Sequence, residues 1–276
     1  MTTVVINTAN ALGDFVLSWP ILRALQGTTV LVCPAEKAAL ASDVLSIPSL
    51  PVHTPPWNDI FRGTPAGVGM GMDRVISIGA LTESCRAALL AGAPGIELIE
   101  TPAPLDRVRT LEWASRLGKP TPPCRGGNAA GPVTLHAGSG GRGKRWPLDR
   151  WIALSEVLRT RAVTLVAGEV EFEQWCSIDR DTFTRSGGEF VTSLAALRRR
   201  LESSRLVVAA DCGPGHLAAA LGVPTLSLFG PTDAARWAPI GPASRVVAPP
   251  TPRPMEWLSV EEAAASVGSH DDANAR

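Results

Sequence analysis

Short apolar runs alternate along the chain with longer segments in which apolar residues recur every three to four positions. The first pattern is typical of buried strands and the second of amphipathic helices. In the first half, the patterns predict strands near 4–6, 29–33, 75–78 and 96–99, and helices near 15–26, 35–41, 82–91 and 106–117. Strands that alternate with helices predict a parallel sheet with helices on both faces.

The same alternation returns in the second half of the chain. Strands are predicted near 133–136, 162–167, 206–209 and 224–229, and helices near 148–159, 170–178, 193–203 and 214–221. Between the halves, residues 119–132 are rich in Pro, Gly and Asn, which is typical of a linker. We therefore expect two doubly wound, Rossmann-like α/β domains, at 1–120 and 133–267. The small polar residues 268–276 are expected to form a disordered tail.

Composition agrees with two ordinary hydrophobic cores and excludes several other classes of protein. Of the 276 residues, 45% are hydrophobic and 19% charged, and the formal net charge is zero. A neutral chain has no global field that would attract nucleic acid. The apolar runs are shorter than the roughly 18 residues of a membrane span, and the sequence opens on a predicted strand instead of a signal peptide, so a cytoplasmic protein is expected. Five widely spaced cysteines, without the paired spacing of a metal site, are expected to be reduced thiols.

A polar cluster interrupts this pattern at residues 211–216, where Asp-Cys-Gly-Pro-Gly-His separates a predicted strand from a predicted helix. Open α/β sheets bind phosphate at this kind of place, where a strand ends and the first N–H groups of a helix are free. Gly213 and Gly215 permit close backbone approach, and His216 falls in the first turn, where it can hydrogen-bond the same anion. The structural alternative is that the glycines serve only the turn and that His216 is a surface residue.

A second cluster, at residues 136–147, is a glycine-rich loop with three cations that ends at Pro147, the predicted first position of the next helix. It lacks the Gly-Lys-Ser/Thr ending of a P-loop, so Walker-type nucleotide hydrolysis is not expected. Lys144 is one of only three lysines in a chain with twenty-three arginines, which suggests that a compact point charge is required there. The alternative is a solvated basic loop.

The third cluster lies near the start, where the predicted strand 4–6 gives way to a loop of small residues and then to a helix. Asp14 stands just before the periodic apolar residues of this helix, and we expect it to be the N-cap. Capping alone accounts for an aspartate at this position. Catalysis by Asp14 is therefore a hypothesis that this cluster does not carry by itself.

Taken in this order, the three clusters resemble the motifs of glycosyltransferase family 9, the ADP-heptose:lipopolysaccharide heptosyltransferases and their relatives. The resemblance lies in Ala-Leu-Gly-Asp at 11–14 with Pro20, in Gly-Ser at 138–139 with Lys-Arg-Trp-Pro at 144–147, and in Asp-x-Gly-Pro-x-His at 211–216 with Phe-Gly-Pro-Thr at 229–232. It implies a GT-B architecture, in which two Rossmann-like domains face each other across a cleft. The N-terminal domain would bind the acceptor and the C-terminal domain the nucleotide sugar.

Some features depart from the family pattern. Thr8 stands where family members usually carry an arginine, and Cys212 stands where they carry threonine or serine. The chain is also short for the family, and the shortening falls on the half that would hold the acceptor. The resemblance therefore leaves the identity of the acceptor open.

The resemblance implies an inverting transfer of a sugar, heptose from ADP-heptose by the family pattern, to an acceptor hydroxyl. Such a transfer requires a base for the hydroxyl and stabilisation of the departing diphosphate. Asp14 is the candidate base and Lys144 the candidate cation. No metal or cofactor is expected, since an ammonium and a helix dipole would take the place of a metal. The carboxylates of Asp179 and Asp181 are discounted as metal ligands because they fall in an apparent loop.

The remaining candidates are assigned to the donor or the acceptor side. Asp211 is expected to accept hydrogen bonds from sugar hydroxyls. The resemblance implies that Glu171 contacts the nucleoside, while the alternative is a first-turn glutamate that favours the helix dipole. The expected donor-binding residues are Ser139, Gly140, Glu171, Asp211, Cys212, Gly213, Pro214 and His216, and the expected acceptor side includes Asn10 and Gly13. Trp146 and Trp151 are expected to pack their helix instead of stacking on a base.

The expected partners are therefore a nucleotide-sugar donor and a glycan, lipid-linked or small-molecule acceptor, with no nucleic acid and no transmembrane segment. Attachment at the inner face of the membrane is left open. Two other classes of function remain as alternatives. A nucleotide-sugar epimerase or hydrolase would form product without an acceptor, and a non-catalytic sugar-nucleotide sensor would tolerate the loss of Asp14.

Overall fold

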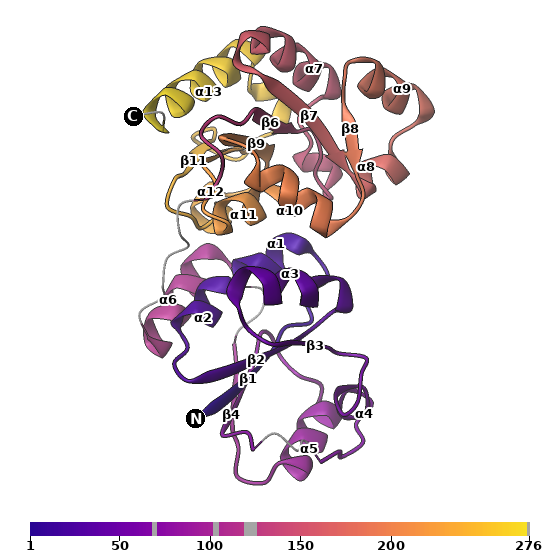
Figure 1. Cartoon of the computed structure of the whole chain (residues 1–276), viewed down its shortest axis with the longest axis vertical. Coiled ribbons are helices and arrows are strands. Elements are labelled where there is room, and N and C mark those ends of the chain that lie inside the picture. Colours follow the sequence, from indigo (N-terminus) through magenta and orange to yellow (C-terminus); the bar gives the residue numbers. More distant parts are fainter. Residues whose placement is uncertain (68–70, 102–104, 119–125, 275–276) are drawn as a thin grey trace. The chain divides into compact units, whose positions relative to one another are not determined.

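The computed structural model describes residues 1–67, 71–101, 105–118 and 126–274. The chain divides into two compact units, Met1–Thr121 and Pro122–Arg276, each built on one parallel sheet (Figure 1). The predicted fold class, two parallel-sheet α/β domains, is confirmed. The first part of the predicted linker, residues 119–125, lies outside the described residues.

The sheet of the first unit has the order β3-β2-β1-β4-β5, and all of its neighbouring strands are parallel. The strands are β1 (Thr2–Ile6), β2 (Thr28–Cys33), β3 (Ser49–Pro51), β4 (Arg74–Ser77) and β5 (Glu97–Glu100). The helices are α1 (Leu12–Leu17), α2 (Trp19–Ala24), α3 (Ala35–Leu45), α4 (Trp57–Phe61), α5 (Glu83–Gly92) and α6 (Arg107–Leu117).

Side chains alternate along each strand, so the core of the first unit is divided between the two faces of the sheet. On one face, Val4 and Ile6 of β1 share a buried cluster with Trp57 of α4. A separate cluster joins α2 and α6 through Ile21 and Ala114. Figure 1 shows α4 and α5 on one side of this sheet and α2 and α6 on the other, which is the doubly wound arrangement.

The sheet of the second unit has the order β11-β10-β9-β6-β7-β8, again with parallel neighbours. The strands are β6 (Val133–His136), β7 (Val163–Gly168), β8 (Glu189–Val191), β9 (Leu206–Ala210), β10 (Thr225–Leu228) and β11 (Ser244–Val247). The α-helices are α7 (Leu148–Val157), α8 (Glu169–Gln174), α9 (Ser177–Arg185), α10 (Leu194–Glu202), α11 (Gly213–Ala220), α12 (Ala234–Trp237) and α13 (Val260–Asn274), and short 3-10 turns lie at η1 (Arg142–Lys144), η2 (Arg159–Arg161) and η3 (Met255–Trp257).

The main core of the second unit lies between the sheet and the helices α7 and α13. Leu135 and Val208 of the sheet share this core with Trp151 of α7 and Val267 of α13. Trp146 and Trp151 are both buried and meet edge to face with ring centroids 5.0 Å apart, so the prediction that they pack the helix is confirmed. Figure 1 shows α10 and α11 on the opposite side of the sheet from α7 and α13.

Several local predictions are wrong. Asp14 is not an N-cap, because α1 begins at Leu12 with Ala11 as its cap, and Asp14 lies in the first turn. Pro147 precedes α7 as its N-cap instead of opening it. Asp179 and Asp181 lie within α9 and not in a loop.

The predicted disordered tail is also wrong, because α13 continues to Asn274. The carboxylate of Asp271 is buried and accepts hydrogen bonds of 3.0 Å from Arg161 and of 3.0 and 3.2 Å from Arg205. These contacts attach the end of α13 to η2 and to the start of β9. Composition suggested disorder because small polar residues bury little apolar area, but here buried ion pairs supply the attachment.

Candidate active site

The second unit gathers most of the predicted donor-side residues at the carboxyl ends of its two central strands. β6 and β9 are neighbours in the sheet, and the chain continues from them toward opposite edges, β6 toward β7 and β9 toward β10. The loops that follow β6 and β9 therefore leave the sheet side by side and then diverge. Such a switch in strand order is where open α/β sheets bind their ligands.

The centre of this arrangement is the buried carboxylate of Asp211, which directly follows β9. Its Oδ2 accepts a 3.2 Å hydrogen bond from Nζ of Lys144 and a 2.8 Å hydrogen bond from the hydroxyl of Thr232. Its Oδ1 lies 3.8 Å from Nε2 of His216. Three loops, after β6, β9 and β10, thus meet at one carboxylate.

Electrostatics keeps this carboxylate ionised. Burial would raise the pKa of Asp211, but His216, the charge of Lys144 and the hydroxyl of Thr232 outweigh burial and together lower that pKa. Asp211 is therefore a charged acceptor surrounded by hydrogen-bond donors. The carboxylate can accept from sugar hydroxyls, and the donors around it can bind an anion.

The loop after β6 is joined to the loop after β9 by a second contact. The hydroxyl of Ser139 donates to the backbone carbonyl of Asp211 at 3.1 Å. Arg145 in turn donates from Nε to the carbonyl of Ser139 at 2.7 Å and from its terminal nitrogen to Gln174 at 2.6 Å. The glycine-rich loop is therefore fixed at Ser139, while Gly140 is exposed and has open space where a side chain would lie.

Helix α11 begins beside Asp211. Cys212 is its N-cap and makes no side-chain capping hydrogen bond, so the first turn at Gly213 and Pro214 keeps the partial positive charge of a helix start. Gly215 packs closely on the sheet, since an added Cβ would lie 3.4 Å from Cβ of Ala209. His216 is buried and not a surface residue, and its Nδ1 has no hydrogen-bond partner among the described residues.

The thiol of Cys212 is not a nucleophile. Burial raises the pKa of Cys212 to about 12, so the thiol stays protonated. Its Sγ lies 3.9 Å from Nδ1 of His136. Burial lowers the pKa of His136, and the neutral ring accepts a 3.3 Å hydrogen bond from the backbone N–H of Gly138. Cys212 and His136 therefore pack against each other beneath the loops that follow β9 and β6.

Glu171 lies under the same loop. It is 3% exposed, and its Oε2 accepts a 3.1 Å hydrogen bond from the N–H of Gly168. Oε1 has no hydrogen-bond partner within the described part of the chain and lies 4.0 Å from Arg145. A Cβ on Gly138 would fall 2.2 to 2.5 Å from the Glu171 carboxyl atoms, so a larger residue there would require the buried carboxyl group to move. Glu171 is thus a buried first-turn glutamate with one carboxylate oxygen unpaired.

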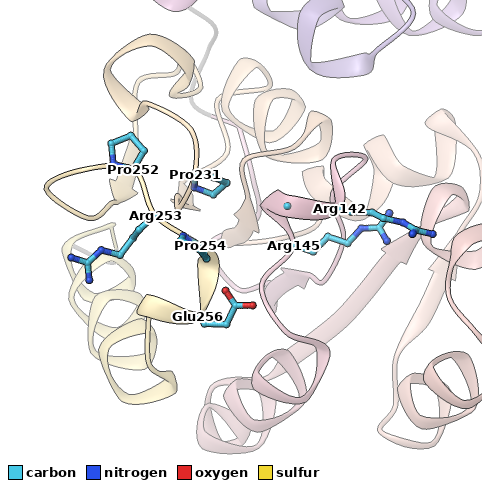
Figure 2. A pocket seen from close by; sticks show the side chains of 8 residues that line it. Arg142, Arg145, Pro231, Pro252, Arg253, Pro254 and Glu256 are labelled. Atoms are coloured by element: carbon cyan, nitrogen blue, oxygen red, sulfur yellow. The ribbon is translucent and has the colours of Figure 1, made fainter.

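An open pocket of about 450 Å³ adjoins these contacts (Figure 2). It is lined by Arg142, Gly143, Arg145, Pro231, Pro252, Arg253, Pro254 and Glu256. In Figure 2 the side chains of Arg142 and Arg253 extend to opposite sides. Pro231 immediately precedes Thr232, so the pocket borders the Asp211 contacts.

The first unit places the other predicted residues at the carboxyl end of β1. Asp14 is exposed in the first turn of α1, and Asn10 and Gly13 lie on the loop and helix start that lead to it. Thr8, which stands at the position where family members usually carry an arginine, is exposed. Buried Lys37 of α3 contacts the same loop and donates from Nζ to the carbonyls of Ala9 and Asn10. Asp14 therefore belongs to the first unit and the Asp211 contacts to the second.

Three residues of this region received no role from the sequence. Thr232 belongs to the Gly-Pro-Thr motif after β10, and this motif could have indicated from the sequence that Thr232 is part of the site. Arg145 and Lys37 act on backbone carbonyls of distant loops, and sequence spacing gives no signal for such contacts. Within the described residues no group of three or more His, Cys, Asp or Glu side chains could hold a metal ion, and no helix is long and apolar enough to cross a membrane.

Comparison with known proteins agrees with this geometry. Residues 128–256 match the sequence model of glycosyltransferase family 9 (heptosyltransferase). A 41-residue stretch is 63% identical to lipopolysaccharide heptosyltransferase 1 of Pseudomonas aeruginosa, covering 15% of this chain and 12% of that relative. The predicted resemblance to family 9 is confirmed.

Solved structures share the fold over nearly the whole chain. Escherichia coli heptosyltransferase WaaC with ADP superposes with a TM-score of 0.71 at 17% identity, covering 98% of this chain and 100% of that one. Escherichia coli ADP-heptose LPS heptosyltransferase II gives 0.73 at 16% identity with full coverage of both. A family 9 glycosyl transferase from Veillonella parvula gives 0.73 at 16% identity, covering 99% and 97%.

Proposed function

We propose, from the premise that the chain carries a glycosyltransferase family 9 segment at residues 128–256, that it transfers a sugar from a nucleotide-sugar donor to an acceptor hydroxyl. The observation that carries this proposal is the Asp211 carboxylate held by Lys144, His216 and Thr232 at the switch point of the second sheet. Such a group of donors around one charged acceptor suits a ligand that has both phosphates and hydroxyls.

The proposed donor is ADP-heptose. Solved relatives of the same fold are described with ADP, with ADP-2-deoxy-2-fluoro heptose and with ADP-D-beta-D-heptose. The diphosphate is placed at the start of α11 and at Lys144, and Asp211 accepts hydrogen bonds from the sugar. Buried Glu171, with an unpaired carboxylate oxygen beneath the same loop, is proposed to accept a hydrogen bond from the nucleoside.

In this mechanism the departing diphosphate gains negative charge as the glycosidic bond breaks. Lys144 is half-buried and can turn from Asp211 toward that charge, and the first turn of α11, which no N-cap side chain satisfies, adds the partial positive charge of a helix start. Both interactions become stronger as the charge develops, so they favour the transition state over the bound donor. We propose that they suffice without a divalent metal.

Asp14 is the proposed base. Its carboxylate is exposed in the first turn of α1, where an acceptor hydroxyl can reach it. A single base that deprotonates the hydroxyl, with no covalent nucleophile, gives inversion at the anomeric carbon. The proposed acceptor is a glycan, lipid-linked or small hydroxyl compound on the cytoplasmic side, where the enzyme works in solution or at the inner face of the membrane.

A donor panel tests the proposal. The protein is incubated with ADP-, UDP-, GDP- and dTDP-sugars, with and without lipopolysaccharide core acceptors, and donor turnover is followed by mass spectrometry. The expected result is release of ADP from ADP-heptose together with a mass gain on the acceptor. A donor that is isomerised or hydrolysed at full rate without acceptor would replace the transferase by an epimerase or hydrolase. Binding of ADP without any turnover would favour a sensor.

A further inference from the structure

Lys37 is a buried lysine at the start of α3, and it reaches across to the loop that carries the proposed base. The side chain is 3% exposed. Nζ donates hydrogen bonds of 2.6 Å to the carbonyl of Ala9 and of 2.5 Å to the carbonyl of Asn10. These two residues come directly before Ala11, the N-cap of α1.

The charge of this lysine is compensated by several weaker contacts instead of one tight ion pair. Glu36 lies 3.8 Å away, but its side chain is 63% exposed and makes no tight ion pair. Burial lowers the pKa of Lys37, and the charges of Glu36 and Asp14 act in the opposite direction. Nζ also lies 5.7 Å from the ring centroid of Phe15 in α1, a cation–π contact that favours the ammonium.

Hydrogen bonding to the carbonyls of Ala9 and Asn10 does not by itself require a charged side chain at position 37. A neutral side chain could donate to the same carbonyls without the cost of burying an ammonium group. The other contacts of the loop are of that neutral kind, since Asn7 accepts from the N–H of Ala9 at 3.0 Å and donates to the hydroxyl of Ser18 at 2.8 Å. The helix start that follows the two carbonyls carries Asp14, whose negative charge acts against the lowering of the Lys37 pKa by burial.

We infer that Lys37 is a positioning residue for Asp14: it fixes the carbonyls of Ala9 and Asn10, and with them the start of α1, so that the Asp14 carboxylate is held in place for the acceptor. This inference rests on the proposed function of Asp14 as the base. A misplaced catalytic group loses rate steeply, because a shift of roughly 1 Å can cost on the order of a hundredfold.

The test is a double-mutant cycle of Lys37→Met and Asp14→Asn in the full chain, with ADP-heptose turnover as the rate and ADP as the binding probe. We expect Lys37→Met to lower kcat by roughly tenfold to a hundredfold while the Kd for ADP stays unchanged, since ADP binds the second unit. In the Asp14→Asn background the same change should lower the residual rate less than about twofold, because its effect passes through Asp14. Glu83→Gln is the matched control, an 88% exposed first-turn carboxylate of α5, and should leave kcat unchanged.

A second measurement does not depend on turnover. Amide hydrogen exchange in a peptide covering residues 8–15 should be faster in Lys37→Met than in the wild-type protein, and Lys37→Gln, which keeps an N–H donor, should fall between them. Unchanged exchange together with an unchanged kcat overturns the inference. Equal rate losses in both Asp14 backgrounds overturn it as well, because they indicate general destabilisation. A full rate in Asp14→Asn alone overturns the proposed base, and slow Asp14→Asn beside fully active Lys37→Met overturns only the role of Lys37.

Discussion

Nζ of Lys144 lies 3.2 Å from Oδ2 of Asp211, although the two residues are 67 positions apart and follow different strands. The contact exists because β6 and β9 are adjacent in the sheet and the loops after them leave at the same edge. Asp211 is buried while Lys144 is one-third exposed, so solvent can reach the lysine side chain. Under the proposed function, a diphosphate would compete with the Asp211 carboxylate for the same ammonium.

Lys144→Ala should therefore reduce turnover strongly and weaken the binding of ADP. Loss of one such electrostatic contact to developing charge costs on the order of a hundredfold to a thousandfold in kcat. Arg142→Ala is the comparison, because Arg142 is an exposed cation on the same 3-10 turn that lines the pocket, and its loss should be smaller than that of Lys144→Ala. Steady-state kinetics and ADP calorimetry check both variants. Equal losses of kcat and of ADP affinity in the two variants would indicate that Lys144 is only one of several charges in a solvated basic loop.

Acid unfolding should report on the charge of Asp211. The pKa of Asp211 in the folded protein is below its usual value of 3.8, so its contacts stabilise the fold above that value and lose their contribution as the pH falls through the lower folded pKa. The free energy of unfolding, measured in urea, should therefore be larger for the wild-type protein than for Asp211→Asn at neutral pH. This difference should become smaller in acid. A difference that stays constant with pH would mean that the stabilisation does not come from the charge.

The fold was predictable from the sequence where strands are buried on both sides. The central strands β1 and β9 carry short apolar runs at 4–6 and 206–210, and every residue of β6 and β9 is buried. The edge strands β3, β8 and β11, which are three or four residues long and partly exposed, were missed, whereas the edge strand β5 was predicted from its apolar residues near 96–99. At an edge, pairing with a neighbour decides the structure, and this pairing leaves little trace in local composition.

The candidate site was predictable to the same degree. Residues that follow β6 and β9 could be placed together because the carboxyl ends of parallel strands share one edge. The approach of Thr232 to Asp211, and of Lys37 to the Ala9 carbonyl, depends on where later segments return to the sheet. Such tertiary contacts have no periodicity in the sequence, and the buried position of Lys37 even runs against the usual exposure of lysine.

Gly138→Ala should destabilise the second unit, because the new methyl group would lie 2.2 to 2.5 Å from the carboxyl atoms of Glu171. Overpacking of this kind costs about 1–3 kcal/mol of the free energy of unfolding. The cost should fall in the Glu171→Ala background, where the carboxyl group that the methyl would meet is gone. Gly140→Ala, with nothing within 4 Å of the added Cβ, is the control. Denaturant unfolding of the wild-type protein, the two single variants and the double variant measures this coupling. An equal cost in both Glu171 backgrounds would show that backbone conformation, and not contact with Glu171, requires the glycine.

Transfer should also survive removal of divalent metal. The proposed site offers the diphosphate the Lys144 ammonium and the first turn of α11, while its one central carboxylate, Asp211, already accepts hydrogen bonds from Lys144 and Thr232. A metal that bridges a diphosphate usually needs free carboxylates beside it. Initial rates measured after treatment with EDTA should therefore match those of the untreated enzyme, and added Mg²⁺ or Mn²⁺ should change them little. If chelation abolished transfer and added metal restored it, the exposed carboxylates of Asp179 and Asp181 on α9 would become the first candidates for metal ligands. If metal then failed to restore transfer in an Asp179→Asn, Asp181→Asn variant, this result would identify the two residues as ligands.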